Sequence, residues 1–327
     1  MTAFATPRVS LVIPVLDEAL NLSALYARLA PVMDGIAGGA EAIVIDDGST
    51  DGSLDLLRTI AARDPRVRVL SFNRNYGQRA AVFAGLEATR GRIVLTLDAD
   101  LQNPPEDIPT LVAKVDEGFD VVGGWRQNRK DSAFRRWASR QFNVFMRLIL
   151  REVAFRDYGC MMRAYTRPVV DSMLQCEDRT PYIPALACQF ARRVAEVPIG
   201  HAQRTAGRSK YGVLKLVRLQ ADLVTGFTTA PLKLAAIVGA GVALVSIGFG
   251  LFLVLRRLLQ GPEAEGVFTL FAILFLLVGG NFLALGLLGE YVGRIYVEVR
   301  RRPRSVIAET INFGDARVGA RPRESDD

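Results

Sequence analysis

The chain has 327 residues, 50% of them hydrophobic, which is enough for one sizeable domain and an additional apolar segment. Its three cysteines, Cys160, Cys176 and Cys188, show no CxxC spacing, so a zinc site and a disulfide framework are excluded and a reducing compartment is indicated. A net charge of +7 and a pI near 9.6 are typical of proteins that bind nucleic acid, anionic lipid or a phosphorylated substrate.

The first 124 residues alternate short β-rich runs with helical stretches. Strands are predicted over residues 9–16, 40–49, 67–72, 92–100 and 119–124. Helices are predicted over residues 18–33, 52–64, 78–91 and 107–118. This βαβα order predicts an α/β fold with a mostly parallel sheet and helices on both faces. Because no GxGxxG and no Walker lysine follows the first strand, a Rossmann dinucleotide site and a P-loop are disfavoured.

Two pairs of carboxylates stand at the carboxyl ends of predicted strands, where open α/β sheets bind ligands. Asp46 and Asp47 could accept a base N–H or a ribose hydroxyl. Asp98 and Asp100 are two residues apart, so on a continued strand they point to one face, where their repulsion favours a bound cation. Oxygen ligands without a nearby His or Cys favour Mg²⁺ or Mn²⁺ over zinc. The alternative is an Asp-rich turn that caps the next helix.

A basic amphipathic helix is predicted over residues 132–151. Phe134, Trp137 and Phe145 share its apolar face, and four arginines lie on another face. This pattern is typical of a helix that lies in a membrane interface. The alternative is a surface helix packed on the sheet.

Two uncharged stretches near the C-terminus predict membrane-spanning helices. Residues 234–255 and 267–288 contain no charged side chain, and each is long enough to cross a hydrocarbon layer of about 30 Å. Basic residues precede the first stretch and follow the second, which predicts that both ends face the cytoplasm. The N-terminus lacks the apolar core of a signal peptide, so the N-terminal domain is expected in the cytosol. Membrane spans favour anionic lipid or a phosphorylated substrate over nucleic acid as the partner.

The expected organisation is a cytosolic domain followed by a membrane hairpin. Its parts are the domain over 1–208, an interfacial helix over 209–231, spans over 232–255 and 267–289, and a cytosolic tail over 290–327.

Several motifs together resemble a known family. The segments "SLVIPVLDEALNL", "IDDGSTDGS" and "LDADLQNPPEDIP", with the two apolar stretches, resemble the family-two glycosyltransferases that act on polyprenyl phosphates, the group containing dolichol-phosphate mannose synthase. The segments "FNRNYGQRAA", "WRQNRKDS", "DYGCMMRAY", "GVFTLFAILF" and "LLGEYVGRIY" look closer to the branch that transfers formamido-arabinose to undecaprenyl phosphate in lipid A modification. The resemblance is collinear from about residue 9 to residue 304.

This resemblance implies a GT-A fold, a UDP-sugar donor, Mg²⁺ or Mn²⁺, inversion at the anomeric carbon and a bacterial inner-membrane location. It implies a uridine pocket lined by Pro14, Glu18, Asp46 and Asp47. It implies that the metal and the diphosphate are bound by Asp98, Asp100 and Gln102. It gives Asp157 the role of orienting the donor or of a base. It implies that the lipid phosphate is held by Arg126, Arg135 and Ser139. It also implies a loop that closes over the donor and contains Arg204, Ser209 and Lys210. It also implies a homo-oligomer, a tetramer, and contacts with anionic membrane lipids.

The resulting hypothesis is transfer of a 4-amino-4-deoxy-L-arabinose derivative from UDP to undecaprenyl phosphate. Arg208 replaces the acidic residue usual in the closing loop, and Gly124 and Trp125 also depart from the branch pattern near the expected donor. Transfer of a hexose such as glucose, for O-antigen or cell-wall decoration, is therefore an alternative. A membrane-anchored sugar-nucleotide sensor or scaffold is the non-enzymatic alternative.

Overall fold

The computed structural model describes residues 6–126, 155–157, 159–176, 182–201, 230–260, 266–300 and 303–314. The chain divides into two compact units, Met1–Lys210 with Arg302–Asp327, and Tyr211–Arg301. The expected interfacial helix over 132–151 lies outside the described residues, and so does the one over 209–231 except for its last two residues, which belong to the helix that begins at Ala230.

The described residues of the first unit form an eight-stranded sheet in the order β7-β5-β6-β4-β1-β2-β3-β8. The strands are β1 (Val9–Val15), β2 (Ala40–Asp46), β3 (Val67–Phe72), β4 (Ile93–Thr96), β5 (Val121–Arg126), β6 (Arg163–Thr166), β7 (Val194–Ile199) and β8 (Ile307–Ile311). β1 pairs in parallel with β2 and β4, β2 with β3, and β5 with β7. β6 is antiparallel to β4 and β5, and β8 is antiparallel to β3. The predicted α/β class with a mostly parallel sheet is confirmed.

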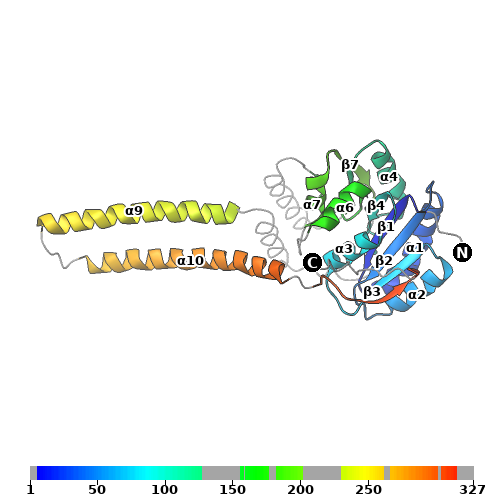
Figure 1. Cartoon of the computed structure of the whole chain (residues 1–327), viewed down its shortest axis with the longest axis horizontal. Helices are drawn as coiled ribbons and strands as arrows, with labels where there is room; N and C mark the ends of the chain where they lie inside the picture. Colours follow the sequence, from blue (N-terminus) through cyan, green and yellow to red (C-terminus); the bar gives the residue numbers. More distant parts are fainter. Residues whose placement is uncertain are drawn as a thin grey trace, which may run out of the picture. The chain divides into compact units, whose positions relative to one another are not determined.

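Helices cover both faces of this sheet (Figure 1). They are α1 (Ala19–Asp34), α2 (Ser53–Arg63), α3 (Gln78–Ala88), the 3₁₀ turn η1 (Pro105–Asp107), α4 (Ile108–Asp116), α6 (Arg167–Gln175) and α7 (Ile183–Phe190). Apolar residues of α1, α2 and α4 share one buried core with Val9 and Leu11 of β1. On the other face, a Cβ on Gly85 of α3 would lie 2.4 Å from Val12 and 2.6 Å from Ile45, so glycine allows this helix to sit close to β1 and β2.

The fourth predicted strand is shorter than expected. It was expected to continue through Asp98 and Asp100, but β4 ends at Thr96. Leu97 N still donates to Val12 O at 3.0 Å, and Leu101 then adopts a φ of 60°. Residues 99 and 100 form a turn, and the left-handed φ of Leu101 continues this change of direction, so Asp98 and Asp100 follow the strand rather than extend it.

The eighth strand is a feature that the sequence pattern did not predict. It lies within the stretch expected to be a cytosolic tail, and it pairs with the edge strand β3 (Figure 1). Arg58 donates to both oxygens of Glu309 at 3.1 and 2.5 Å. Asn312 Nδ2 donates to Ala61 O and Val67 O at 2.8 and 2.7 Å. Part of the C-terminal segment is therefore an integral strand of the first unit.

The second unit contains two long helices, α9 (Ala230–Gln260) and α10 (Val267–Val299), which contact each other. Within the part of the chain that the structure describes, no helix is long and apolar enough to cross a membrane.

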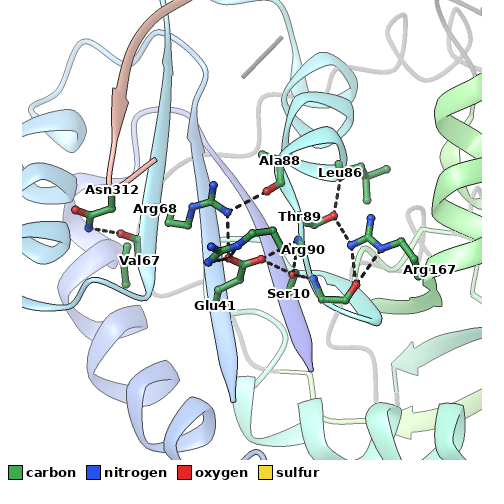
Figure 2. A network of polar contacts seen from close by, with 11 residues as sticks. Ser10, Glu41, Val67, Arg68, Leu86, Ala88, Thr89, Arg90, Arg167 and Asn312 are labelled. Carbon is green, nitrogen blue, oxygen red and sulfur yellow. Dashed lines mark hydrogen bonds and ion pairs between the residues drawn. The ribbon is translucent and has the colours of Figure 1, made fainter. Parts of the chain in front are cut away.

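A buried polar network lies at the amino ends of the central strands (Figure 2). Glu41, the second residue of β2, accepts from Ser10 of β1 at 2.7 Å and from Arg68 of β3 at 3.0 Å. It also accepts from Arg90, beyond α3, at 2.7 and 3.0 Å. Burial alone would raise the pKa of Glu41, but the hydrogen bonds from Arg90 and Ser10 outweigh it and hold the pKa below its usual value. The network joins three strands at the end of the sheet opposite the predicted site.

Candidate functional site

The loops after β1 and β2 are hydrogen-bonded to each other at the carboxyl edge of the sheet. Asp17 adopts a φ of 53°, and its N–H donates to Ser49 Oγ at 3.0 Å. Thr50 N donates back to Asp17 Oδ1 at 2.9 Å. Glu18 N donates to Ser53 Oγ at 3.0 Å, while its carboxylate accepts from Asn21 Nδ2. Pro14 is half-buried within β1 immediately before this loop. Pro14 and Glu18 therefore lie at the carboxyl edge of the sheet, and their role in a uridine pocket stays a prediction.

Asp46 and Asp47 are both buried and bonded within the protein. Asp46 is 1% exposed and accepts from Ser71 Oγ at 2.9 Å and Ser49 N at 3.2 Å. Asp47 is 2% exposed and accepts from two consecutive backbone amides, Tyr76 N at 2.7 Å and Gly77 N at 2.8 Å. Burial raises the pKa of Asp47 despite these two bonds, and the neighbouring Asp46 raises it further. The Asp47 carboxylate thus fixes the loop after β3 against the loop after β2.

Asp98, Asp100 and Gln102 follow β4 in alternation with buried residues. All three are partly exposed, whereas the residues between them, Ala99 and Leu101, are buried. Gln78 Nε2 donates to Asp98 Oδ1 at 2.8 Å, and Gln102 N donates to Asp100 Oδ1 at 3.1 Å. Because β4 ends before Asp98, these residues lie in a turn rather than on a strand, and their common face stays a prediction.

This donor set suits a hard divalent cation. It offers two carboxylates and one amide oxygen, the ligand types that Mg²⁺ and Mn²⁺ prefer. Among the described residues, no group of three or more His, Cys, Asp or Glu side chains could hold a metal ion by itself. Mg²⁺ is commonly bound by one or two carboxylates together with substrate phosphates, so a two-carboxylate site fits a cation that arrives with a diphosphate.

Arg126 and Asp157 form a bidentate ion pair at the same edge. Arg126 Nε and Nη2 donate to the two Asp157 oxygens at 2.7 and 3.0 Å, and both side chains are largely buried. Arg126 ends β5, whereas Asp157 precedes β6. Because β6 is antiparallel to β5, its beginning lies beside the carboxyl end of β5. The sequence suggested separate roles for these two residues, and the structure brings them into contact.

A buried arginine supports the turn that carries Asp157. Arg163 is 1% exposed and donates to Asp157 O at 2.9 Å and Cys160 O at 3.0 Å. Glu196 of β7 accepts from the backbone N–H of Arg156 and Asp157. Neither Arg163 nor Glu196 was among the predicted site residues. The contacts of Glu196 join residues 39 and 40 positions apart, which no local pattern signals, whereas those of Arg163 lie within six positions. Gln78 was also missed, although it lies in the quoted segment "FNRNYGQRAA".

Two buried cysteines, Cys160 and Cys188, are poorly suited to act as nucleophiles. Burial raises the pKa of Cys160 to about 12, with the nearby Asp157 adding to the effect, and burial raises the pKa of Cys188 to about 11. A thiol that stays protonated at neutral pH is a poor nucleophile, so covalent cysteine catalysis is disfavoured.

Five predicted residues fall outside the described part of the chain. These are Arg135 and Ser139 of the predicted phosphate site, and Arg204, Ser209 and Lys210 of the predicted closing loop.

The glycosyl transferase family 2 model matches residues 10–173, which contain the described carboxylates from Asp17 to Asp157 and both partners of the Arg126–Asp157 ion pair. The chain belongs to glycosyltransferase family 2. Two bacterial members are similar over nearly their whole length, and both are named undecaprenyl-phosphate 4-deoxy-4-formamido-L-arabinose transferase. The protein of Shewanella sediminis is 49% identical over 318 residues, which covers 96% of this chain and 95% of that protein. The protein of Edwardsiella ictaluri is 50% identical over 306 residues, which covers 93% and 94%.

The fold of this glycosyltransferase is also seen in a solved structure. Glucosyl-3-phosphoglycerate synthase from Mycobacterium tuberculosis, in complex with Mn²⁺, UDP-glucose and phosphoglyceric acid, gives a TM-score of 0.51 at 23% identity, covering 67% of this chain and 78% of that one. This likeness confirms the expected GT-A-like architecture.

Proposed function

We propose that this glycosyltransferase moves 4-deoxy-4-formamido-L-arabinose from UDP to undecaprenyl phosphate, in the modification of lipid A. The observation that carries the proposal is the 49% identity to a transferase of that name over 96% of the chain. The position of Asp98, Asp100 and Gln102 supports it, since these partly exposed residues follow β4 at the carboxyl edge where α/β sheets bind ligands.

The chemistry assigned to this site is displacement of UDP by a phosphate oxygen with inversion at the anomeric carbon. A phosphate monoester is anionic at neutral pH, so the acceptor needs little help to attack. The barrier then lies in the departure of UDP and in alignment of the acceptor. A divalent cation held by Asp98, Asp100 and Gln102 would neutralise the leaving diphosphate as a Lewis acid.

The remaining residues bind and orient the two substrates. Pro14, Glu18 and the buried pair Asp46 and Asp47 form or support the uridine pocket. Asp157 acts through Arg126: its two oxygens accept from Nε and Nη2, which fixes the plane of the guanidinium that holds the acceptor phosphate.

The same proposal extends to segments outside the described residues. Arg135 and Ser139 complete the phosphate site with Arg126, because a guanidinium presents paired donors that match a phosphate. Arg204, Ser209 and Lys210 close over the bound donor.

We also propose that the protein resides in the bacterial inner membrane through residues 232–255 and 267–289, with its catalytic domain and both termini in the cytoplasm. The uncharged sequence of both stretches and the basic residues that flank them support this topology. Anionic lipids would attract the basic segment over 132–151. The family resemblance supports a homotetramer.

A donor comparison tests the transferase function. Protein in nanodiscs that contain undecaprenyl phosphate is supplied with UDP-4-deoxy-4-formamido-L-arabinose or UDP-glucose, and the lipid product is identified by mass spectrometry. The expected result is arabinosyl lipid with Mg²⁺ or Mn²⁺, and loss of product with EDTA or in Asp100→Ala. Efficient use of UDP-glucose alone would replace the arabinose proposal by the hexose alternative. Absence of product from any donor, with intact folding, would favour the sensor or scaffold.

A further inference from the structure

Gln78 is an unassigned residue that touches the proposed metal site. It is the first residue of α3 and is exposed, and its Nε2 donates to Asp98 Oδ1 at 2.8 Å. The bond links the loop after β3 to the loop after β4, across 20 residues of sequence. An amide donor on one carboxylate oxygen restricts rotation of the carboxylate about χ2.

The position of Gln78 is set by a buried group in a third loop. Gly77, the residue before α3, has a φ of 95°, which a residue with a Cβ rarely adopts. Its N–H and that of Tyr76 both donate to the carboxylate of Asp47, which is 2% exposed. These two bonds fix the start of α3 to the loop after β2, and they thereby hold Gln78 where its amide reaches Asp98.

The chemical type of this donor suits a cation site. A lysine or arginine in the same place would orient Asp98 equally well, but its charge would form an ion pair with the carboxylate and oppose a bound cation. The neutral amide of glutamine orients Asp98 and leaves its negative charge in place. The arrangement resembles the outer hydrogen bonds that commonly orient metal-ligating side chains.

We propose that Gln78 is a positioning residue that orients the Asp98 carboxylate toward a divalent cation and the diphosphate of a nucleotide donor, and that Asp47 holds Gln78 in place through the turn before α3. This inference rests on the proposed function. It adds a role for α3 that the sequence motifs do not assign.

The test measures metal binding separately from turnover. Gln78→Met keeps the length of the side chain and removes the donor, whereas Gln78→Asn keeps the amide on a chain too short to reach Asp98. Gln175→Met, at the exposed end of α6, is the matched control. Each full-length protein in nanodiscs is titrated with Mn²⁺ in the presence of UDP, with free Mn²⁺ followed by electron paramagnetic resonance. UDP binding without metal and the melting temperature are measured alongside.

Both Gln78 variants are expected to bind Mn²⁺ about 10- to 100-fold more weakly, the range typical of lost outer hydrogen bonds at metal sites. Metal-free UDP binding, the melting temperature and the control should match the wild type. Unchanged Mn²⁺ affinity in Gln78→Met would overturn the role of Gln78 while leaving the metal site intact. A parallel loss of metal-free UDP binding and melting temperature would also overturn it, because it would indicate a collapsed loop. Failure of the wild-type protein to bind Mn²⁺ would overturn the metal site itself, and the role of Gln78 with it.

Discussion

At the scale of single residues, the backbone around the site allows little substitution. Gly48 has a φ of 71°, and a Cβ placed on it would lie 2.5 Å from the carbonyl carbon of Arg74. The loop that carries Asp47 therefore contacts the loop after β3 backbone to backbone. This close approach is what allows the Asp47 carboxylate to reach Tyr76 N and Gly77 N. Glycine is needed here for both its φ and its size.

Replacing this glycine should damage both stability and activity. Gly48→Ala is expected to lower the free energy of unfolding by about 2–5 kcal/mol, because left-handed strain and overpacking add. Gly39→Ala is the control, since Gly39 has a φ of 80° but open space around it, and it should lose only about 1–2 kcal/mol. Denaturant unfolding followed by circular dichroism measures both variants. Equal losses of unfolding free energy in Gly48→Ala and Gly39→Ala would show that the close approach of Arg74 adds no destabilisation.

At the scale of secondary-structure elements, Glu41 joins parts that the sheet alone does not hold together. It links β1, β2 and β3 and also binds Arg90 beyond the end of α3 (Figure 2). Arg68 additionally donates to Ala88 O, and Arg167 at the start of α6 donates to Gly91 O. Because Glu41 is 2% exposed, its charge depends on these partners.

Stability should therefore fall in acid through Glu41. The pKa of Glu41 is lowered in the folded state. The ionised carboxylate therefore stabilises the protein fully at a pH above 4.5, the usual pKa of glutamate, and this contribution is lost as the pH falls through the folded-state pKa. Glu41→Gln should cost about 3–5 kcal/mol at pH 7, because it leaves Arg68 buried without its charge partner. The difference between wild type and variant should shrink at acidic pH.

An exposed ion pair provides the control for this experiment. Glu106 binds Arg28 at 2.7 Å with both side chains well exposed, so Glu106→Gln should cost less than about 1 kcal/mol. The test is to measure the melting temperatures of the wild type and of both variants between pH 3 and pH 7. A constant difference between wild type and Glu41→Gln over that range would contradict the proposed linkage.

At the scale of the whole molecule, the chain returns to its first unit after the two long helices. β8 pairs with β3, Phe313 lies 3.9 Å from the Arg68 guanidinium, and Arg304 donates to Cys176 O at 2.9 Å. Residues 303–314 therefore belong to the same folded body as the sheet. A strand cannot pair across a membrane, so these residues must share the compartment of the N-terminal unit.

This pairing sharpens the topology prediction. Cysteines introduced next to Met1 and Asp327 should both resist a membrane-impermeant maleimide in intact cells, because both ends are expected in the cytoplasm. A cysteine within residues 260–266, which connect α9 and α10, should react. Labelling is followed by mass shift, with permeabilised cells as the positive control. Reaction at either terminus in intact cells would refute the arrangement.

The sequence alone determined the fold class and the family. Alternation of β-rich and helical runs predicted the elements up to about residue 124, and each was found with ends that differ by a few residues. These predictions succeed because periodicity and turn residues act locally. The collinear motifs likewise predicted family 2, and the match to the family model and the 49% identity to a relative over 96% of the chain confirmed it. The residue roles assigned by resemblance stay predictions.

Only the tertiary structure decided how the site residues are held. The bond from Gln78 to Asp98, the ion pair of Arg126 with Asp157, and the pairing of β8 with β3 join residues that are 20, 31 and more than 200 positions apart. No periodicity in the sequence signals such contacts, because they depend on which strands become neighbours in the folded sheet, in both parallel and antiparallel pairs. The shortening of β4 was missed for a related reason: the apolar pattern continues through Leu97, Ala99 and Leu101, whereas the left-handed turn at Leu101 depends on packing that forms only in the folded sheet.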